Sequence, residues 1–198
     1  AALRQALQEF CPDLIHAQHA WCLSWLASLC SLPLVVTIHG TDLMGCKKWP
    51  AFRSFAEEAV AGSAKVLAVS ADNRNLALEQ LPMAADKLLL LPNGYNEDIF
   101  YREDVDKEAL FSSLGLPYCG EYIVLFVGKL AAFKGVDTLL RAARRYEWLA
   151  DREFITLIVG DGEERESLSE LHKQLGLRST FFLGNQKQDE LRRLYNAA

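Results

Sequence analysis

Two kinds of hydrophobic pattern alternate along this chain. Short apolar runs rich in Val, Ile and Leu are typical of buried strands, and stretches in which apolar residues recur every three or four positions are typical of amphipathic helices. The apolar runs predict strands at 13–18, 33–40, 64–70, 87–94, 122–128, 154–162 and 180–184. The helical patterns lie at 20–31, 51–61, 71–81, 105–114, 135–149, 163–175 and 188–197. Apolar strands alternating with helices indicate parallel sheets covered on both faces, so we expect an α/β fold of doubly wound, Rossmann-like sheets.

The alternation breaks once, between Asn93 and Glu121. Turn residues and acids crowd together there, in the segment LPNGYNEDIFYREDVD. Such a break is typical of a domain boundary, and we place it near residue 95, which gives two α/β domains, 1–95 and 96–198. The chain starts inside a helical pattern, AALRQALQEF, and stops at LYNAA. We therefore expect a fragment that is cut at both ends.

Composition narrows the range of functions. The net charge is −5, and neither half is basic, so a nucleic-acid-binding domain is excluded. Five cysteines without CxxC spacing indicate a reduced, cytoplasmic protein and no metal site. The uncharged stretch from Leu14 to Thr41 contains Pro33 and several serines, which favours a buried helix and strand over a membrane span.

The segment FVGKLAAFKGVDTLLRAA (126–143) carries the strongest candidate chemistry. Lys129 directly follows a predicted strand that ends at Gly128, and Lys134 precedes the next helix. Ligands of parallel α/β sheets bind at the carboxyl ends of the strands. Two ammonium groups there, beside the N–H groups of a helix start, suit a diphosphate. Two solvated surface lysines are the alternative, but the position of Lys129 favours a ligand.

That segment resembles the donor-phosphate motif of the family-four glycosyltransferases, which are retaining enzymes of the GT-B fold. Further segments resemble the family in the same order and extend the likeness over nearly the whole chain: PDLIHAQ, PLVVTIHGTDL, AKVLAVS, LLLPNGYNEDIF, LIVGDGEERESL and FFLGNQKQDELRRLYNAA. The resemblance implies a partial GT-B fold, with an acceptor-side domain at 1–95 and a nucleotide-sugar donor domain at 96–198. It also implies transfer of a sugar from a nucleotide-diphosphate sugar to a saccharide or lipid-linked acceptor, with retention and without a metal or another cofactor.

The resemblance assigns roles by position. Lys134 and Lys129, with Gly128, would bind the donor diphosphate, although Lys129 stands where the family usually has Arg and lacks its planar fork. His39 would face the donor sugar across a cleft and take part in catalysis; a histidine that packs at the strand end, with Thr41 as partner, is the alternative. The nucleotide and sugar pocket would be lined, largely through backbone, by Gly160, Asp161, Gly162, Leu183, Gly184 and Asn185.

Other candidates have simpler structural explanations. His16 alternates with apolar residues and is expected to be a satisfied strand histidine; His19 is a weak candidate for a ligand, and His172, on a charged helix, is expected to be solvated. Asp104-Val105-Asp106 spells the DxD of metal-dependent glycosyltransferases, but acids that approach a helix are better explained as stabilising its start. The GDGEE stretch lacks the third glycine of a dinucleotide fingerprint, which disfavours a dehydrogenase.

The segment KKWPAFRSF (47–55) mixes cations with aromatic residues. A loop whose aromatic side chains pack inward is the preferred explanation, and peripheral contact with the cytoplasmic face of a membrane stays open.

Two other functions also stay open, a GT-B-type nucleotide-sugar epimerase and a non-catalytic GT-B-like binding module. The family's glycine-rich loop would precede Ala1 and its glutamate pair would follow Ala198, so we expect little or no transfer by this polypeptide alone.

Overall fold

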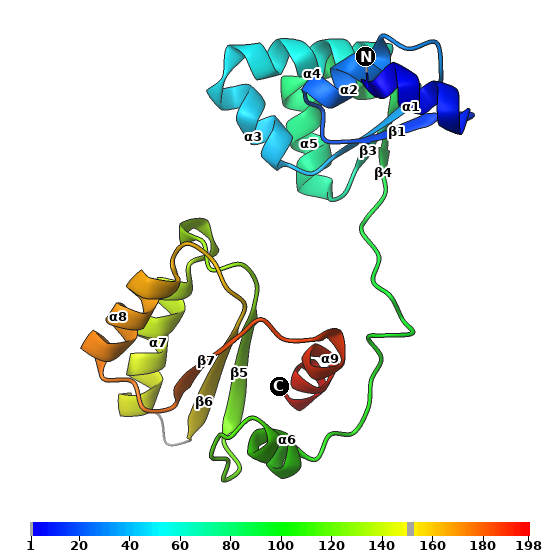
Figure 1. Cartoon of the computed structure of the whole chain (residues 1–198). Helices are drawn as coiled ribbons and strands as arrows, with labels where there is room; N and C mark the ends of the chain where they lie inside the picture. Colours follow the sequence, from blue (N-terminus) through cyan, green and yellow to red (C-terminus); the bar gives the residue numbers. More distant parts are fainter. Residues whose placement is uncertain (1, 150–152) are drawn as a thin grey trace. The chain divides into compact units, whose positions relative to one another are not determined.

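The computed structural model describes residues 2–149 and 153–198, and it divides into two compact units, Ala1–Gly94 and Tyr95–Ala198. The division falls next to residue 95, where the sequence pattern places a boundary. Each unit has its own parallel sheet and its own buried core, and each is described separately below (Figure 1).

The first unit contains a four-stranded parallel sheet with the strands in chain order. The strands are β1 (Ile15–Gln18), β2 (Leu34–Ile38), β3 (Lys65–Ala68) and β4 (Leu88–Leu90). The helices are α1 (Ala2–Phe10), α2 (Cys22–Ser28), α3 (Thr41–Lys48), α4 (Pro50–Gly62), α5 (Ala71–Gln80) and the short 3₁₀ helix η1 (Pro82–Lys87).

The core of the first unit lies on one face of its sheet. Crossovers between parallel strands are right-handed, so strands in chain order place their connecting helices on the same side. Val36 and Ile38 of β2 are fully buried in a cluster with Ala27 of α2, Val60 of α4 and Ala77 of α5. Successive strand residues point to opposite sides, and the opposite face carries residues that are half-buried or exposed, apart from the buried Thr37 of β2.

The second unit contains a three-stranded parallel sheet, again in chain order. The strands are β5 (Tyr122–Val127), β6 (Phe154–Val159) and β7 (Thr180–Gly184). The helices are α6 (Lys107–Ser113), α7 (Val136–Leu149), α8 (Arg165–Leu175), α9 (Gln188–Ala197) and the single-turn 3₁₀ helix η2 (Ala132–Lys134).

Both faces of the second sheet are covered. Leu157 of β6 is buried in a cluster with Phe111 of α6 and Leu194 of α9, whereas its neighbour Ile158 is buried in a second cluster with Leu140 of α7. The two crossover helices α7 and α8 lie on one side, and α6 and α9, which flank the strands in sequence, lie on the other (Figure 1). Every strand here is a near-continuous apolar run, as sheets covered on both faces require.

The predicted α/β fold is confirmed, and all seven predicted strands are present. The sequence pattern missed α3 (Thr41–Lys48), so the segment 47–55 is not a loop but the end of one helix and the start of the next. The two helices meet at Trp49, whose extended backbone ends α3 before Pro50 opens α4. Within the described residues, none of the helices has the length and apolar character that crossing a bilayer demands.

Candidate functional site

The carboxyl ends of the three strands in the second unit are joined by backbone hydrogen bonds through their glycines. The Gly128 N–H donates to the carbonyl oxygen of Val159 at 3.0 Å, and the Gly160 N–H donates to that of Gly184 at 2.8 Å. Gly128, Gly160 and Gly184, which the sequence assigns to the donor site, therefore lie side by side at one sheet edge. This is the edge at which α/β sheets bind ligands.

The loops that follow β5 and β6 interlock, and two glycines make this possible. Gly160 has φ +125°, and a Cβ atom there would overlap the carbonyl oxygen of Gly128. A Cβ atom on Gly162 would overlap the carbonyl oxygen of Leu130. The Leu130 N–H donates to the Asp161 carbonyl, and the Glu164 N–H donates back to the Leu130 carbonyl, both at 3.0 Å. The structure thus brings Gly160, Asp161 and Gly162 beside the loop that carries Lys129.

Lys129 is engaged by a residue that the sequence analysis did not single out. Its Nζ lies 2.8 Å from Oε2 of Glu163, and both side chains are more than half exposed, at 62% and 56%. The hydrogen bond from Lys129 holds the pKa of the Glu163 carboxyl below its usual value. Glu163 is visible in the sequence GDGEE, three residues after the β6 loop begins at Gly160. Its partner is not visible there, because the pairing depends on the two loops meeting in space.

Lys134 ends the turn η2, and Gly135, with φ +66°, leads from it into α7. Its Nζ lies 5.4 Å from the ring centroid of Phe133, and no described carboxylate is within ion-pairing distance of it. Lys134 therefore keeps a free positive charge at the start of a fourteen-residue helix, whereas the charge of Lys129 is partly neutralised. Convergence of the two ammonium groups on one ligand stays a prediction.

The remaining predicted pocket residues follow β7. The register between β6 and β7 shifts by one residue after Phe182, so that Leu183 is skipped in the pairing and its side chain packs against the cluster around Phe111. Asn185 is exposed and lines a hollow with residues of α6 and α9. These surroundings of Leu183 and Asn185 do not include the loop that carries Lys129. The role of the two residues in nucleotide binding stays a prediction.

In the first unit, the buried carboxylate of Asp42 organises the loops after β1 and β2. Asp42 is fully buried and accepts hydrogen bonds from three backbone N–H groups, those of Ala20 (2.9 Å), Leu43 (3.1 Å) and His39 (3.2 Å). A carboxylate that accepts several N–H bonds is well suited to burial. Asp42 thereby ties the β1 loop to the first turn of α3 and fixes the backbone of the predicted catalytic histidine.

His39 forms a polar network with β1. Its Nε2 lies 2.7 Å from Gln18 Oε1, and Gln18 Nε2 donates to His16 Nε2 at 3.2 Å. His16 Nε2 also lies 2.8 Å from Thr37 Oγ1, which confirms His16 as a satisfied strand histidine. The partner of His39 is thus Gln18, and Thr41 is not part of this network.

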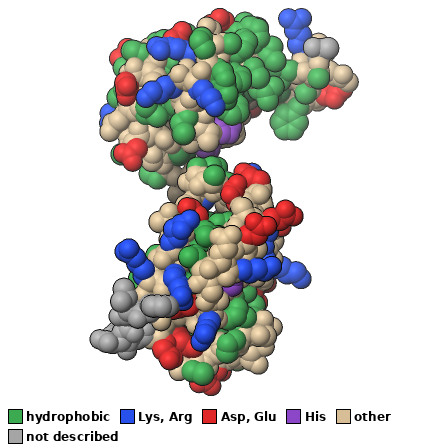
Figure 2. Space-filling model, turned by 90° about the vertical axis from the view of Figure 1, so that its left-hand side faces the viewer, with side chains coloured by type: hydrophobic (Ala, Val, Ile, Leu, Met, Phe, Trp, Pro, Cys, Tyr) green, Lys and Arg blue, Asp and Glu red, His purple; other side chains and the backbone are tan. Residues whose placement is uncertain are grey.

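His19 has more contacts than the sequence suggested. Its ring stacks on Trp21 at a centroid distance of 5.1 Å and lies 4.7 Å from the His39 ring. Its backbone has φ +67°, a left-handed conformation that is uncommon for a residue other than glycine. Figure 2 shows histidine side chains reaching the surface of the first unit beside hydrophobic ones. The sequence pattern gives His19 only as a weak candidate; its contact with His39, from the loop after β2, forms only in the folded chain.

Two of the simpler explanations can be compared with the structure. Asp106 caps α6, since its Oδ1 accepts from the Ala109 N–H at 3.0 Å, which confirms that this acid stabilises a helix start. The prediction for His172 is wrong: it is not a solvated side chain. Its Nε2 lies 2.9 Å from the carbonyl oxygen of Thr180, and its ring packs edge-on against Phe182, because α8 lies directly on β7.

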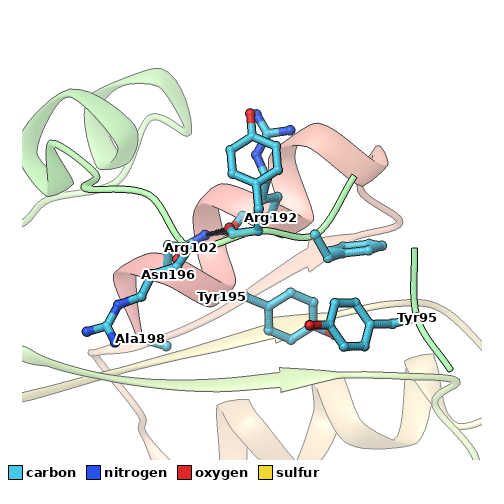
Figure 3. Close-up of a pocket in the computed structure, with 8 residues that line it drawn as sticks. Tyr95, Arg102, Arg192, Tyr195, Asn196 and Ala198 are labelled. Atoms are coloured by element: carbon cyan, nitrogen blue, oxygen red, sulfur yellow. Dashed lines mark hydrogen bonds between the residues drawn. The ribbon is translucent and has the colours of Figure 1, made fainter. Parts of the chain in front are cut away.

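The second unit also has a hollow that lies away from these loops. It measures about 700 Å³ and is lined by residues of the segment after residue 94 and of α9 (Figure 3). Arg192 closes one side through hydrogen bonds to Glu103 and Asp189, and the Glu103 bond raises the pKa of its guanidinium. The Asn196 amide donates to the Tyr101 carbonyl at 2.9 Å. These hydrogen bonds tie the segment after residue 94 to α9.

Comparison with known proteins identifies the fold and the family of this chain. Two units, each built on a parallel α/β sheet, make up a partial GT-B fold. The family described as Glycosyltransferase Family 4 matches residues 1–99, and the family described as Glycosyl transferases group 1 matches residues 107–198. The chain therefore belongs to the family-4 glycosyltransferases of the GT-B fold.

Relatives and solved structures agree with this assignment. A D-inositol 3-phosphate glycosyltransferase of Corynebacterium aurimucosum is 30% identical over 94% of this chain and 48% of its own length. An uncharacterized glycosyltransferase of Methanocaldococcus jannaschii is 28% identical over 94% of this chain and 50% of its own. The crystal structure of Anabaena HepE with UDP and glucose superimposes with a TM-score of 0.77 at 21% identity, covering 96% of this chain and 52% of that one. The chain thus spans about half the length of these relatives.

Proposed function

We propose that this chain is part of a retaining, metal-independent glycosyltransferase that takes a sugar from a nucleotide-diphosphate donor. The observation that carries the proposal is the glycine-lined sheet edge of the second unit, where Lys129 and Lys134 flank the loop after β5. The similar HepE was crystallised in complex with UDP and glucose, which supports a nucleotide-sugar donor here.

The proposed role of the two lysines is to stabilise the negative charge of the leaving group. Departure of a nucleoside diphosphate from an oxocarbenium-like sugar builds negative charge on the leaving group. Cations held where that charge develops stabilise the transition state more than the ground state, which accelerates the step. In our proposal the two lysines fill this role in place of a metal ion. Gly160 lets the loops after β5 and β6 pack closely at this edge, since a side chain there would overlap the Gly128 carbonyl.

His39 is proposed as the contact to the donor sugar or its leaving phosphate. The Asp42 carboxylate fixes its backbone N–H, and Gln18 holds its Nε2, so the ring has a defined orientation. A neutral imidazole in that orientation can exchange the Gln18 hydrogen bond for one to a sugar hydroxyl. The acceptor is proposed to be a saccharide or a lipid-linked saccharide, handled in the cytoplasm or at its membrane face.

A non-catalytic binding module is the second candidate, and one observation favours it. Glu163 neutralises part of the charge of Lys129, and an acid at the diphosphate site weakens its attraction for an anion. A module of this kind would bind a nucleotide sugar weakly and turn nothing over. A GT-B epimerase remains the enzyme alternative, and a structure of that class, the UDP-GlcNAc 2-epimerase of Neisseria meningitidis, superimposes with a TM-score of 0.55.

Ligand-observed NMR with UDP-, GDP- and ADP-glucose tests the proposal. We expect saturation transfer to at least one donor, and we expect Lys134→Ala to remove most of it. Lys173→Ala is the matched control, because Lys173 is an exposed lysine in the last turn of α8, and it should leave binding unchanged. Equal saturation transfer in Lys134→Ala and the unaltered chain would contradict the proposed donor site.

A further inference from the structure

Four polar side chains meet on one face of the first sheet, near the carboxyl ends of β1 and β2. They are His16 and Gln18 of β1, Thr37 of β2, and His39, which follows the end of β2. Alternate residues of a strand point to the same side, and the parallel register places Gln18 beside Thr37. We call these four side chains the imidazole–amide network. It lies on the sheet face opposite the helix-covered core.

Gln18 stands between the two histidines and offers each of them a different atom. Its Oε1 lies 2.7 Å from His39 Nε2, and its Nε2 lies 3.2 Å from His16 Nε2. A primary amide accepts hydrogen bonds through its oxygen and donates them through its nitrogen. His39 must therefore carry a proton on Nε2 in order to donate, whereas His16 must keep Nε2 bare in order to accept. When both rings are neutral, the proton of His16 is then on Nδ1.

Thr37 supports this order of donors and acceptors. Its Oγ1 lies 2.8 Å from His16 Nε2, and a hydroxyl group can donate to a bare ring nitrogen. If His16 carried its proton on Nε2, that N–H would face the NH₂ group of Gln18. Turning the amide round would remove this clash but would place the NH₂ group against the N–H of His39. One amide thus couples the proton positions of the two rings.

Other contacts hold the position of His39 but leave its tautomer to Gln18. The backbone N–H of His39 donates to Asp42 Oδ1 at 3.2 Å, and its ring lies 4.7 Å from the ring of His19. Among the residues that the structure describes, none forms a hydrogen bond with His39 Nδ1. The hydrogen bond that a histidine ring makes decides which of its nitrogens carries the proton. For His39 that hydrogen bond is the one to Gln18.

We propose that Gln18 is a positioning residue of the transfer site, which holds His39 in the Nε2–H tautomer by coupling it to the opposite tautomer of His16. The inference rests on the proposed function, in which His39 contacts the donor sugar or its leaving phosphate. An Nε2–H group can donate to a sugar oxygen or a phosphate oxygen. A ring with its proton on Nδ1 would present a lone pair at the same place, and a phosphate oxygen would be repelled.

A purely structural role is the alternative for Gln18, as a side chain that only ties β1 to β2. Such a tie needs a hydrogen bond between the strands but sets no relation between the tautomers of His16 and His39. The two roles therefore differ in a spectroscopic property, the identity of the protonated nitrogen in each ring.

Long-range ¹H–¹⁵N NMR of the labelled chain provides the test, in alkaline buffer where histidine side chains are neutral. We expect a roughly fivefold to tenfold excess of the Nε2–H form in His39 and of the Nδ1–H form in His16, the effect of one hydrogen bond. Gln18→Glu, whose two oxygens both accept, should move the His16 proton to Nε2 and leave His39 unchanged. Gln174→Leu, which alters an exposed glutamine of α8, is the control and should change neither ring.

Two results would overturn the coupling: the same tautomer in both rings of the unaltered chain, or a His16 ring that stays in the Nδ1–H form in Gln18→Glu. UDP-glucose added to the unaltered chain separates the inference from the proposed function. If the tautomers are opposite and UDP-glucose leaves the His39 ring resonances unchanged, the coupling is supported and the proposed donor contact of His39 fails. If UDP-glucose shifts them while both rings share one tautomer, the donor contact stands and the role of Gln18 is refuted.

Discussion

Lys129 Nζ lies 2.8 Å from Oε2 of Glu163, so a cation of the proposed diphosphate site already has an anionic partner. The contact joins the loop after β5 to the loop after β6, whose backbones are also tied by hydrogen bonds through Leu130. A bound diphosphate has to compete with this carboxylate for Lys129. In our proposal, the strength of donor binding therefore depends on Glu163 as well as on the two lysines.

Glu163→Gln should strengthen UDP binding. The substitution keeps the shape of the side chain and removes a negative charge from the site, so Lys129 becomes fully available. Because the pair is exposed, we expect UDP to bind roughly twofold to fivefold tighter, as measured by isothermal titration calorimetry. Glu170→Gln, an exposed acid farther along α8, is the control and should not change the affinity. Weaker binding in Glu163→Gln would mean that the acid positions Lys129 instead of competing for it.

The Lys129–Glu163 pair should also give a defined pH response. The pKa of Glu163 is lower in the folded chain than the usual glutamate value, because Lys129 donates to its ionised form. The contribution of the pair to stability is thus complete above the usual glutamate pKa and is lost as the pH falls through the lowered value. A carbon-detected NMR titration of the Glu163 carboxyl should give a midpoint below the usual value. Lys129→Ala should raise that midpoint toward the usual value, and an unchanged midpoint would contradict the pairing.

Gly160→Ala should destabilise the second unit. The added Cβ would overlap the Gly128 carbonyl, and φ +125° is strained for any residue with a side chain. We expect a loss of about 3 kcal/mol in the free energy of unfolding, measured by urea denaturation with circular dichroism. Gly94→Ala is the control, since a Cβ there meets nothing within 4 Å, and it should cost less than about 0.5 kcal/mol. Equal stability of both variants would refute the tight approach of the two loops.

Asp42→Ala should destabilise the first unit and release His39. The substitution leaves three backbone N–H groups without their acceptor, in a fully buried position. We expect a loss of roughly 3 kcal/mol in the free energy of unfolding. Asp72→Ala, which alters an exposed acid in the first turn of α5, should cost much less. Amide hydrogen exchange at Ala20 and Leu43 should rise in Asp42→Ala alone; unchanged protection would show that Asp42 does not hold these loops.

The sequence predicted the sheets because their signal is local. The runs around Val36 and Leu157 are apolar and β-branched, and each ends at a glycine or a turn, so their burial and their limits can be read directly. Helix α3 was missed because its apolar residues are few and Gly45 interrupts them. Its start depends instead on Asp42, whose bond to Ala20 joins residues that are far apart in the chain.

The sites were predicted less completely because they depend on contacts between loops. The position of Lys129 after a strand placed it at the ligand edge, but nothing in the sequence paired it with Glu163. The stacking of His19 on Trp21 likewise needs the left-handed turn at His19, which no pattern of hydrophobic residues encodes. Strand ends were thus predictable, whereas the partners of their side chains were not.

The most direct test of the account compares the affinities of UDP and uridine for this chain by isothermal titration calorimetry. If Lys129 and Lys134 bind the diphosphate, UDP should bind at least about tenfold tighter than uridine, and Lys134→Ala should remove most of that difference. Equal affinity for UDP and uridine, or a difference that survives in Lys134→Ala, would contradict the proposed donor site.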